Sequence, residues 1–136
     1  MTDKEAPATS VLVAVRKRPL NTREKELGDD DVVNIGSDGK LELLRSSEPD
    51  ETEYRAFKFD FSYDMDARQD DVYQDVGQPM LDAAFSGFNG TIFAYGQTGS
   101  GKTWSMTGDA SDEKNKGIIP RVCSALFDRI RKESAD

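Results

Sequence analysis

The stretch Gly96-Gln97-Thr98-Gly99-Ser100-Gly101-Lys102-Thr103 decides the fold of this 136-residue chain. It has the spacing G-x-x-x-x-G-K-[ST], in which glycines let the backbone curl so that successive N–H groups converge on phosphate oxygens. These donors lead into a helix N-terminus, whose partial positive charge favours the same anion. We expect Lys102 to reach the β- and γ-phosphates of a nucleotide and the Thr103 hydroxyl to ligate Mg²⁺.

This spacing arises by chance in well under about 1% of chains of this length, so it predicts nucleotide binding. The flanking residues agree with that interpretation. Thr91 to Tyr95 is a short apolar run that predicts a strand entering the loop, and a helix is expected to open at Lys102 or Thr103 and stop near Gly108. Residues 109–116 are predicted to form a solvated loop. The motif alone does not decide between ATP and GTP.

The residues before the loop predict mainly strands. Val11 to Val15 is a β-branched run typical of a strand buried on both faces, and it follows a leader, residues 1–10, that we expect to be flexible. Residues 21–31 and 46–52 are expected to be exposed loops. Strands are also predicted by three further stretches, the first two of which form a hairpin: Val32 to Ile35, Lys40 to Leu44, and Tyr54 to Tyr63.

Two stretches have helical spacing. In the first, from Asp70 to Phe85, Asp70 or Asp71 is expected to cap the start, and Gly87 is expected to stop the helix. Gly77 and Pro79 lie inside this stretch and predict a kink or a late restart. The second stretch runs from Ile119 to Ile130, and its Pro120 suits a first turn.

Composition excludes several classes of function. The chain has 18 basic and 26 acidic residues, a net charge of −8, which argues against non-specific nucleic-acid binding. It has no histidine, so Ser-His-Asp hydrolysis and histidine-ligated zinc are excluded within it. Its single Cys123 allows no internal disulfide, which fits a reducing compartment. No signal peptide or membrane-spanning stretch is evident, so we expect a cytosolic protein without membrane insertion.

Four blocks resemble the kinesin motor domain, in the order of that family. Residues 87–103 are similar to the block G-[YF]-N-G-T-[IV]-F-A-Y-G-Q-T-x-[SA]-G-K-T, and Met106-Thr107-Gly108 follows it. Residues 15–21 are similar to V-R-x-R-P-L-N, and residues 117–121 match G-I-I-P-R. The resemblance covers residues 11–131. It implies an α/β fold: the N-terminal part of a kinesin-type P-loop NTPase motor over residues 11–136, with an incomplete central sheet and helices on both faces.

The resemblance also assigns nucleotide-binding roles. It places Arg16, Arg18 and Pro19 in the adenine pocket, although an Arg-Lys-Arg cluster after a strand is more often a solvated strand end. Trp104 matches a position that flanks the base, where it can stack on adenine; the alternative is a core tryptophan. Gln97 and Thr98 are expected to shape the loop. Residues 59–64 and 69–77 look most like the kinesin-3 pattern.

The function implied is an ATP-dependent microtubule motor, with ATP and Mg²⁺ as cofactors and a cytoplasmic location on the microtubule cytoskeleton. The sequence contains no switch I (N-x-x-S-S-R-S-H) or switch II (D-L-A-G-S-E) motif, so we expect residues 1–136 alone to hold no catalytic residue and to be inactive. The main microtubule contacts are expected outside this stretch.

Two other interpretations remain open. One is a truncated kinesin-like product that binds nucleotide weakly and does no work, and the other is a different phosphate-loop enzyme such as a small kinase. In the family, strands from a later region lie on both sides of the strand that corresponds to residues 91–95. We therefore expect residues 1–136 alone to be poorly folded or prone to aggregation.

Overall fold

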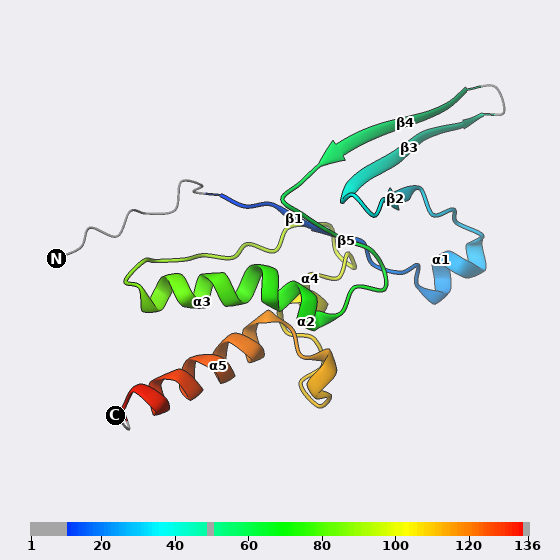
Figure 1. The fold of residues 1–136 in the computed structure, drawn as a ribbon. Coiled ribbons are helices and arrows are strands. Elements are labelled where there is room, and N and C mark those ends of the chain that lie inside the picture. Colours follow the sequence, from blue (N-terminus) through cyan, green and yellow to red (C-terminus); the bar gives the residue numbers. More distant parts are fainter. Residues whose placement is uncertain (1–10, 49–50, 135–136) are drawn as a thin grey trace. The chain divides into compact units, whose positions relative to one another are not determined.

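Strands precede most of the helices along the chain. The computed structural model describes residues 11–48 and 51–134 (Figure 1). The chain divides into two units between Asp64 and Met65. The first unit holds the strands β1 to β5 and one short helix, and the second holds the remaining helices. The leader expected at residues 1–10 lies outside the described residues.

In the first unit, β1 (Ala14–Arg16) pairs in parallel with β5 (Phe61–Tyr63). The predicted strand over Val11 to Val15 is therefore misplaced, because the observed strand begins only at Ala14. It is also not buried on both faces, since Ala14 is exposed and the other two residues of β1 are half-buried. Among the described residues β5 is the only strand that pairs with β1. Just before β1, the Val13 N–H donates to Asp60 Oδ2 at 2.8 Å, and the Val13 carbonyl accepts the N–H groups of Asp60 and Phe61. Residues 11 and 12 thus precede the paired region.

The other strands of the first unit form an antiparallel meander of β2 (Val33–Ile35), β3 (Lys40–Glu48) and β4 (Glu51–Lys58). The predicted β2–β3 hairpin is confirmed, and Gly39 has φ of +75° in its turn. The loop expected at 46–52 is wrong, since β3 and β4 stay paired as far as Glu48 and Glu51. Ladder hydrogen bonds use backbone groups, so polar side chains do not prevent the pairing.

The predicted strand from Tyr54 to Tyr63 is divided into β4 and β5, which belong to different sheets, at residues 59 and 60. The predicted loop at 21–31 contains a helix, α1 (Thr22–Leu27). Asn21 caps this helix: its side chain accepts the Glu24 N–H, and the Glu24 carboxylate accepts the Asn21 N–H. Such a capping box stabilises a helix start that a charged composition conceals.

The second unit begins with a helical stretch of α2 (Gln69–Val72), the π-helical η1 (Tyr73–Gly77) and α3 (Gln78–Phe85). The kink expected at Gly77 and Pro79 takes the form of this π-helical turn, with Pro79 at the start of α3. A Cβ on Gly77 would lie 2.6 Å from the Tyr73 ring, so this position requires glycine. The cap residue is Arg68, whose backbone N–H donates to Asp71, and Gly87 follows the helix end with φ of +91°.

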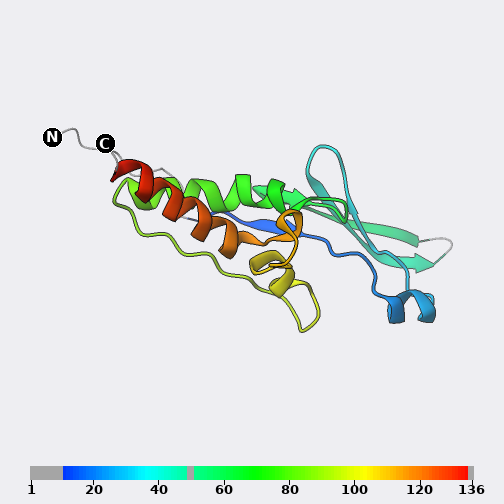
Figure 2. The same ribbon diagram turned by 90° about the horizontal axis from the view of Figure 1, so that it is seen from below.

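The predicted strand from Thr91 to Tyr95 is absent. Figure 2 shows residues 88–95 as an extended segment leading to the phosphate loop, and the structure assigns these residues no strand. Phe93 and Tyr95 are 89 and 102% exposed. A strand requires a hydrogen-bonded neighbour, and among residues 11–48 and 51–134 none pairs with this segment. Apolar patterning alone therefore did not produce the strand.

The remaining helices follow the prediction. The phosphate loop leads into α4 (Lys102–Met106), and the loop at 109–116 contains a single 3₁₀ turn, η2 (Glu113–Asn115). The last helix is α5 (Ile118–Glu133), with Pro120 in its first turn. None of the helices within the described ranges is long and apolar enough to cross a bilayer.

Candidate nucleotide-binding site

The phosphate loop adopts a conformation that needs its glycines. Gly96, Gly99 and Gly101 have φ of +150°, +81° and +96°, a region that L side chains rarely adopt. A Cβ on Gly96 would also lie 2.5 Å from Ser100 Oγ. Inside the loop the Ser100 N–H donates to the carbonyl of Gln97 at 3.2 Å, which closes a turn. The loop therefore curls as the spacing predicts.

The Lys102 ammonium lies over the curled loop. Its Nζ donates to the carbonyl oxygens of Gly96 and Gln97, both at 2.8 Å. An ammonium has three N–H donors, so one N–H of Lys102 remains available for a further acceptor. A positive charge is thus fixed at the mouth of the loop, where an anion would meet it.

The loop ends at the start of α4. Gly101 occupies the N-cap position in the left-handed region, and no side chain caps the helix. The first N–H groups of any helix lack acceptors within the helix, so here they can serve an anion. Thr103 is exposed, next to Lys102, and offers a hydroxyl in the same place. Gln97 and Thr98 are exposed as well, and Gln97 contributes its carbonyl to the Lys102 contact.

Trp104 does not lie in a core. The residue is 44% exposed, so the alternative of a core tryptophan is wrong for this structure. Its backbone carbonyl is held by the Gln69 side chain, whose Nε2 donates to it at 2.7 Å and to the Asn115 carbonyl at 3.1 Å. The position flanking the base remains a prediction for Trp104.

Gln69 and Arg121 support this region and were missed as site residues by the sequence reasoning. Gln69 is only 3% exposed, and it joins α2 to α4 and to the 109–116 loop. Arg121 donates to Asp70 Oδ1 at 3.0 Å and to the carbonyls of Glu113, Lys114 and Lys116. Both lie in stretches that resemble the family, but nothing in their spacing indicates that they bridge separate elements.

The basic cluster in the first unit is not a solvated strand end. Lys17 lies after β1 with its side chain 11% exposed, and its Nζ contacts Asp31 Oδ2 at 2.6 Å, Asp64 Oδ1 at 3.4 Å and the Val33 carbonyl at 2.6 Å. Burial opposes the charge, but the hydrogen bond to Asp31 and the charges of Asp64 and Asp31 outweigh it and raise the pKa of Lys17. Arg16 is half-buried in β1, opposite Tyr63.

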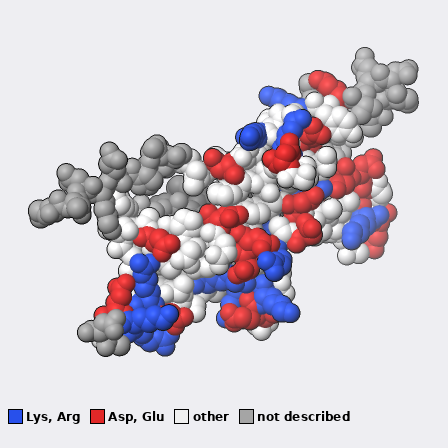
Figure 3. Space-filling view, in the orientation of Figure 1, with Lys and Arg blue, Asp and Glu red and all other residues white. Residues whose placement is uncertain are grey.

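Arg18 is held by α1. Its NH1 donates to Glu24 Oε2 at 2.7 Å and to the Pro19 carbonyl at 2.9 Å, and its NH2 donates to Glu24 Oε1. The bonded Arg18 guanidinium, followed by the Asn21 N–H, lowers the pKa of Glu24 to about 2. Pro19 is exposed beside this pair. The charges of Lys17 and Arg18 are thus locally neutralised. Figure 3 shows other places on the visible face where blue and red side chains adjoin.

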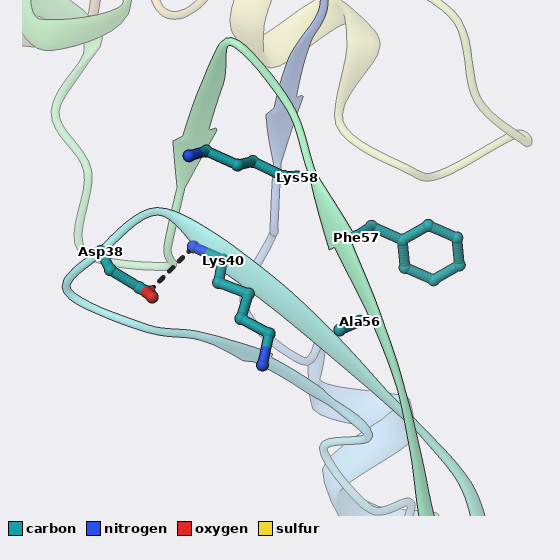
Figure 4. Close-up of a pocket in the computed structure, with 5 residues that line it drawn as sticks. All are labelled: Asp38, Lys40, Ala56, Phe57 and Lys58. Carbon is teal, nitrogen blue, oxygen red and sulfur yellow. Dashed lines mark hydrogen bonds between the residues drawn. The ribbon is translucent and has the colours of Figure 1, made fainter.

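A hollow of about 330 Å³ lies on the meander and contains none of the predicted site residues. Its lining is Asp38, Lys40, Ala56, Phe57 and Lys58, and the Lys40 N–H donates to Asp38 Oδ1 at 3.0 Å (Figure 4). The second unit has an apolar hollow of about 220 Å³ between Met80, Ile92, Met106 and the start of α5. Within the described part of the chain, no three acidic or cysteine side chains gather as metal ligands.

Comparison with known proteins gives the same family along most of the chain. The kinesin motor domain family matches residues 16–136. Kinesin-like protein KIF1A of Rattus norvegicus is 41% identical over 135 residues, covering 93% of this chain and 8% of its own length. Kinesin-like protein Klp68D of Drosophila pseudoobscura pseudoobscura is 37% identical over 129 residues, covering 94% of this chain and 16% of its own length.

Kinesin-like protein unc-104 of Caenorhabditis elegans is 43% identical over 129 residues, covering 90% of this chain and 8% of the relative. KIF1A and unc-104 are kinesin-3 members, which agrees with the kinesin-3 likeness of residues 59–64 and 69–77. The chain therefore spans between 8 and 16% of the length of these three relatives. Because the family match extends over nearly all of its residues, the chain belongs to the kinesin motor domain family and has its P-loop NTPase fold.

Proposed function

We propose that this chain is the nucleotide-binding front part of an ATP-dependent microtubule motor. The observation that carries the proposal is the curled loop of Gly96, Gly99 and Gly101 with the Lys102 ammonium bonded across it. A loop of this shape offers N–H donors and one fixed positive charge, which are the groups that a nucleotide triphosphate requires. Membership of the kinesin motor domain family supports ATP as the nucleotide.

The residues present fit a Mg²⁺–nucleotide complex. A loop that accepted side chains at Gly96 or Gly101 could not adopt the observed φ values without strain, so the cradle is specific to glycine. Lys102 would hold the terminal phosphates through its ammonium, and the Thr103 hydroxyl would be the Mg²⁺ ligand. When bound, the metal supplies charge that offsets the phosphates. No acidic cluster of the described residues competes for that metal.

The base-binding role falls to Arg16, Arg18, Pro19 and Trp104. Two observations support this role for Arg18 and Pro19. The Arg18 guanidinium is bonded to Glu24, and Pro19 is exposed. The methylene stem of Arg18 and the ring of Pro19 can therefore pack against a planar base. Trp104 supports it through its exposure. Packing of this kind depends on surface contact rather than hydrogen bonds.

The filament partner is the microtubule, reached mostly through residues other than 1–136, and the location is the cytoplasmic microtubule cytoskeleton. The likeness to kinesin-like proteins supports this partner. Hydrolysis of ATP would change filament affinity through elements that respond to the terminal phosphate. Residues 1–136 contribute the phosphate and base contacts to that cycle, and no catalytic residue is assigned among them.

The Lys102→Ala substitution, made in the full-length protein, tests the proposal. Loss of a charge that contacts two phosphates should weaken ATP binding by at least about 100-fold, measured by isothermal titration calorimetry with Mg²⁺–ATP. Lys114→Ala removes an exposed lysine of the same unit and should leave the affinity unchanged. Equal ATP affinity in wild type and Lys102→Ala would contradict the role of Lys102.

A second measurement separates a motor from a nucleotide-binding product without motor activity. If the full-length protein is a motor, microtubules should raise its ATP hydrolysis rate, and Lys102→Ala should abolish the increase. ATP binding with no microtubule-stimulated hydrolysis would favour the non-motor alternative.

A further inference from the structure

We propose that Asn89 is a site of spontaneous deamidation, in which the backbone nitrogen of Gly90 attacks the Asn89 side-chain amide. The site lies in the second unit, on the extended segment of residues 88–95 that leads to the phosphate loop (Figure 2). It is a covalent modification site and does not depend on the proposed function. The only co-reactant is water, and the product carries one more negative charge than the original chain.

The reaction balances without an enzyme or an oxidant. A bond forms between the Gly90 nitrogen and the Asn89 side-chain carbonyl carbon, while the bond from that carbon to Nδ2 breaks. The Gly90 N–H proton passes through water to the departing nitrogen, which leaves as ammonia. The resulting succinimide ring then takes up one water. Opening at the side-chain carbonyl gives aspartate, and opening at the backbone carbonyl gives isoaspartate, whose main chain runs through the former side-chain carbon.

Gly90 is suited to the attack. It has no Cβ to hinder the approach of its nitrogen to the Asn89 side chain, and a glycine backbone adopts conformations that other residues rarely reach. Among residues 11–48 and 51–134 the Gly90 N–H donates to no acceptor, so no hydrogen bond has to break before the nitrogen moves. The nearest preceding backbone bond runs from the Phe88 N–H to the Ala83 carbonyl at 3.0 Å.

Asn89 is equally unrestrained. It is exposed, and within the described part of the chain its side-chain amide has no hydrogen-bond partner. Water therefore reaches the ring that the reaction forms. Residues 89 and 90 also precede the stretch Thr91 to Tyr95, for which the sequence predicts a strand. A strand partner for that stretch would thus leave the Asn89-Gly90 bond outside the ladder.

The other asparagines of the chain lack this combination. The Asn21 side chain accepts a hydrogen bond in the cap of α1, and the Asn115 Nδ2 donates to Asp112 Oδ2 at 2.8 Å. Asn34 lies in β2, and the residue that follows it is the β-branched Ile35, which crowds its own nitrogen. Each of these asparagines is therefore held or hindered.

The pair Asp38-Gly39 provides an internal comparison, because an aspartate before glycine can form the same ring by losing water. Here the Gly39 N–H donates to the Gly36 carbonyl at 2.9 Å, and Asp38 Oδ1 accepts the Lys40 N–H at 3.0 Å. Both reacting groups are thus engaged in the turn. The presence of a following glycine is the same at residues 38 and 89, and the hydrogen bonding differs.

The isoaspartate product changes the packing of the segment. A Cβ on Gly90 would lie 2.6 Å from Met80 Cγ, so the Gly90 backbone packs closely on α3. Isoaspartate adds one carbon to the main chain at residue 89, which displaces Gly90 from this contact. Aspartate keeps the ordinary main chain and leaves the contact in place.

The test follows residue 89 by peptide mass spectrometry while the full-length protein is kept at neutral pH and body temperature. Residue 89 should become a mixture of aspartate and isoaspartate, the signature of the ring, several times faster than Asn21 or Asn115 in the same sample. A second sample, unfolded in urea, gives the rate of an unrestrained chain, and the folded protein should react within a few-fold of that rate. Raising the pH should speed the reaction, since the attacking nitrogen must lose its proton.

Asn89→Gln is the matched variant, because its longer side chain requires a larger ring that forms more slowly, and residue 89 should then stay unmodified. At Asp38-Gly39 isomerisation should be slow in the folded protein and accelerate on unfolding. An Asn89 that survives as long as Asn115, or that reacts only after unfolding in urea, would overturn the inference. Conversion to aspartate alone would overturn it as well, because direct hydrolysis of the amide forms no ring.

Discussion

At the scale of single residues, side chains with one sequence signature take very different roles. Lys17 and Arg18 are neighbours in a basic cluster, yet Lys17 joins β2 to the chain beyond β5, whereas Arg18 is bonded to α1. Lys102 is the lysine whose role follows from the motif, since the loop glycines dictate where its ammonium lies. The spacing of the loop thus determines where the Lys102 ammonium lies. Acidic side chains of other elements determine the contacts of Lys17 and Arg18.

The Glu24 carboxylate should make stability depend on pH. Its pKa is held at about 2 instead of its ordinary 4.5, so the folded chain binds the proton less tightly than the unfolded chain. The stabilisation is complete above about pH 4.5 and is lost as the pH falls from there toward 2. The free energy of unfolding of the wild type should therefore fall more steeply over this range than that of Glu24→Gln.

Urea unfolding of the full-length protein at pH 5, 4 and 3 measures this difference in the free energy of unfolding. Glu26→Gln is the control: it changes an exposed glutamate of the same helix and should keep the wild-type pH dependence. Parallel curves for wild type and Glu24→Gln would contradict the assigned ion pair.

At the scale of elements, the segment between α4 and α5 is ordered by side chains from elsewhere. Its ends are joined by an isolated bridge between Gly108 and Lys116, and Gln69 and Arg121 bind its carbonyl groups. A Cβ on Gly108 would lie 2.0 Å from the Asn115 carbonyl oxygen, so the two ends approach too closely for any other residue. The sequence, read alone, describes this segment only as polar.

Arg121→Ala should release the segment. It removes bonds to three carbonyls and the ion pair with Asp70, which together should contribute about 1–3 kcal/mol to the local stability. Limited proteolysis with trypsin should then cut after Lys114 or Lys116 several times faster than in wild type. Arg129→Ala, which removes exposed ion pairs to Asp82 and Glu133, should not accelerate these cuts.

At the scale of the whole molecule, apolar side chains are abundant at the surface. Among the residues whose burial the structure describes, the buried apolar side chains are Leu41 and Tyr63 in the first unit and Val72, Tyr73, Leu81 and Ile118 in the second. Meanwhile Phe93 and Tyr95, on a segment with no strand partner among the described residues, are almost fully exposed. Exposed apolar surface and unpaired backbone favour association between copies.

Residues 1–136 produced alone should therefore aggregate or unfold without cooperativity. The expected observations are binding of the dye ANS at neutral pH and a broad thermal change in circular dichroism. Replacing Phe93 and Tyr95 together by serine should lower both the dye binding and the aggregation. A single cooperative thermal transition for the unmodified polypeptide would contradict this prediction.

Sequence by itself determined the family, the phosphate loop and the helices that flank it. Those features depend on neighbours in the chain: positive φ requires glycine at Gly96, Gly99 and Gly101, and the apolar spacing of α5 requires only its own residues. A strand, in contrast, requires a partner. Thr91 to Tyr95 has the pattern of a strand but no paired neighbour among residues 11–48 and 51–134, while residues 46–48 lack the pattern and pair with β4.

Tertiary structure decided the remaining roles, because they depend on groups far apart in the sequence. Gln69 and Arg121 became supports for α4 and the 109–116 loop through carbonyls up to 46 residues away. Lys17, which follows β1 in the basic cluster expected at a solvated strand end, contacts Asp64, 47 residues further along the chain. The motif thus placed the charge that binds phosphate, and the folded chain decided which other charges are free to act.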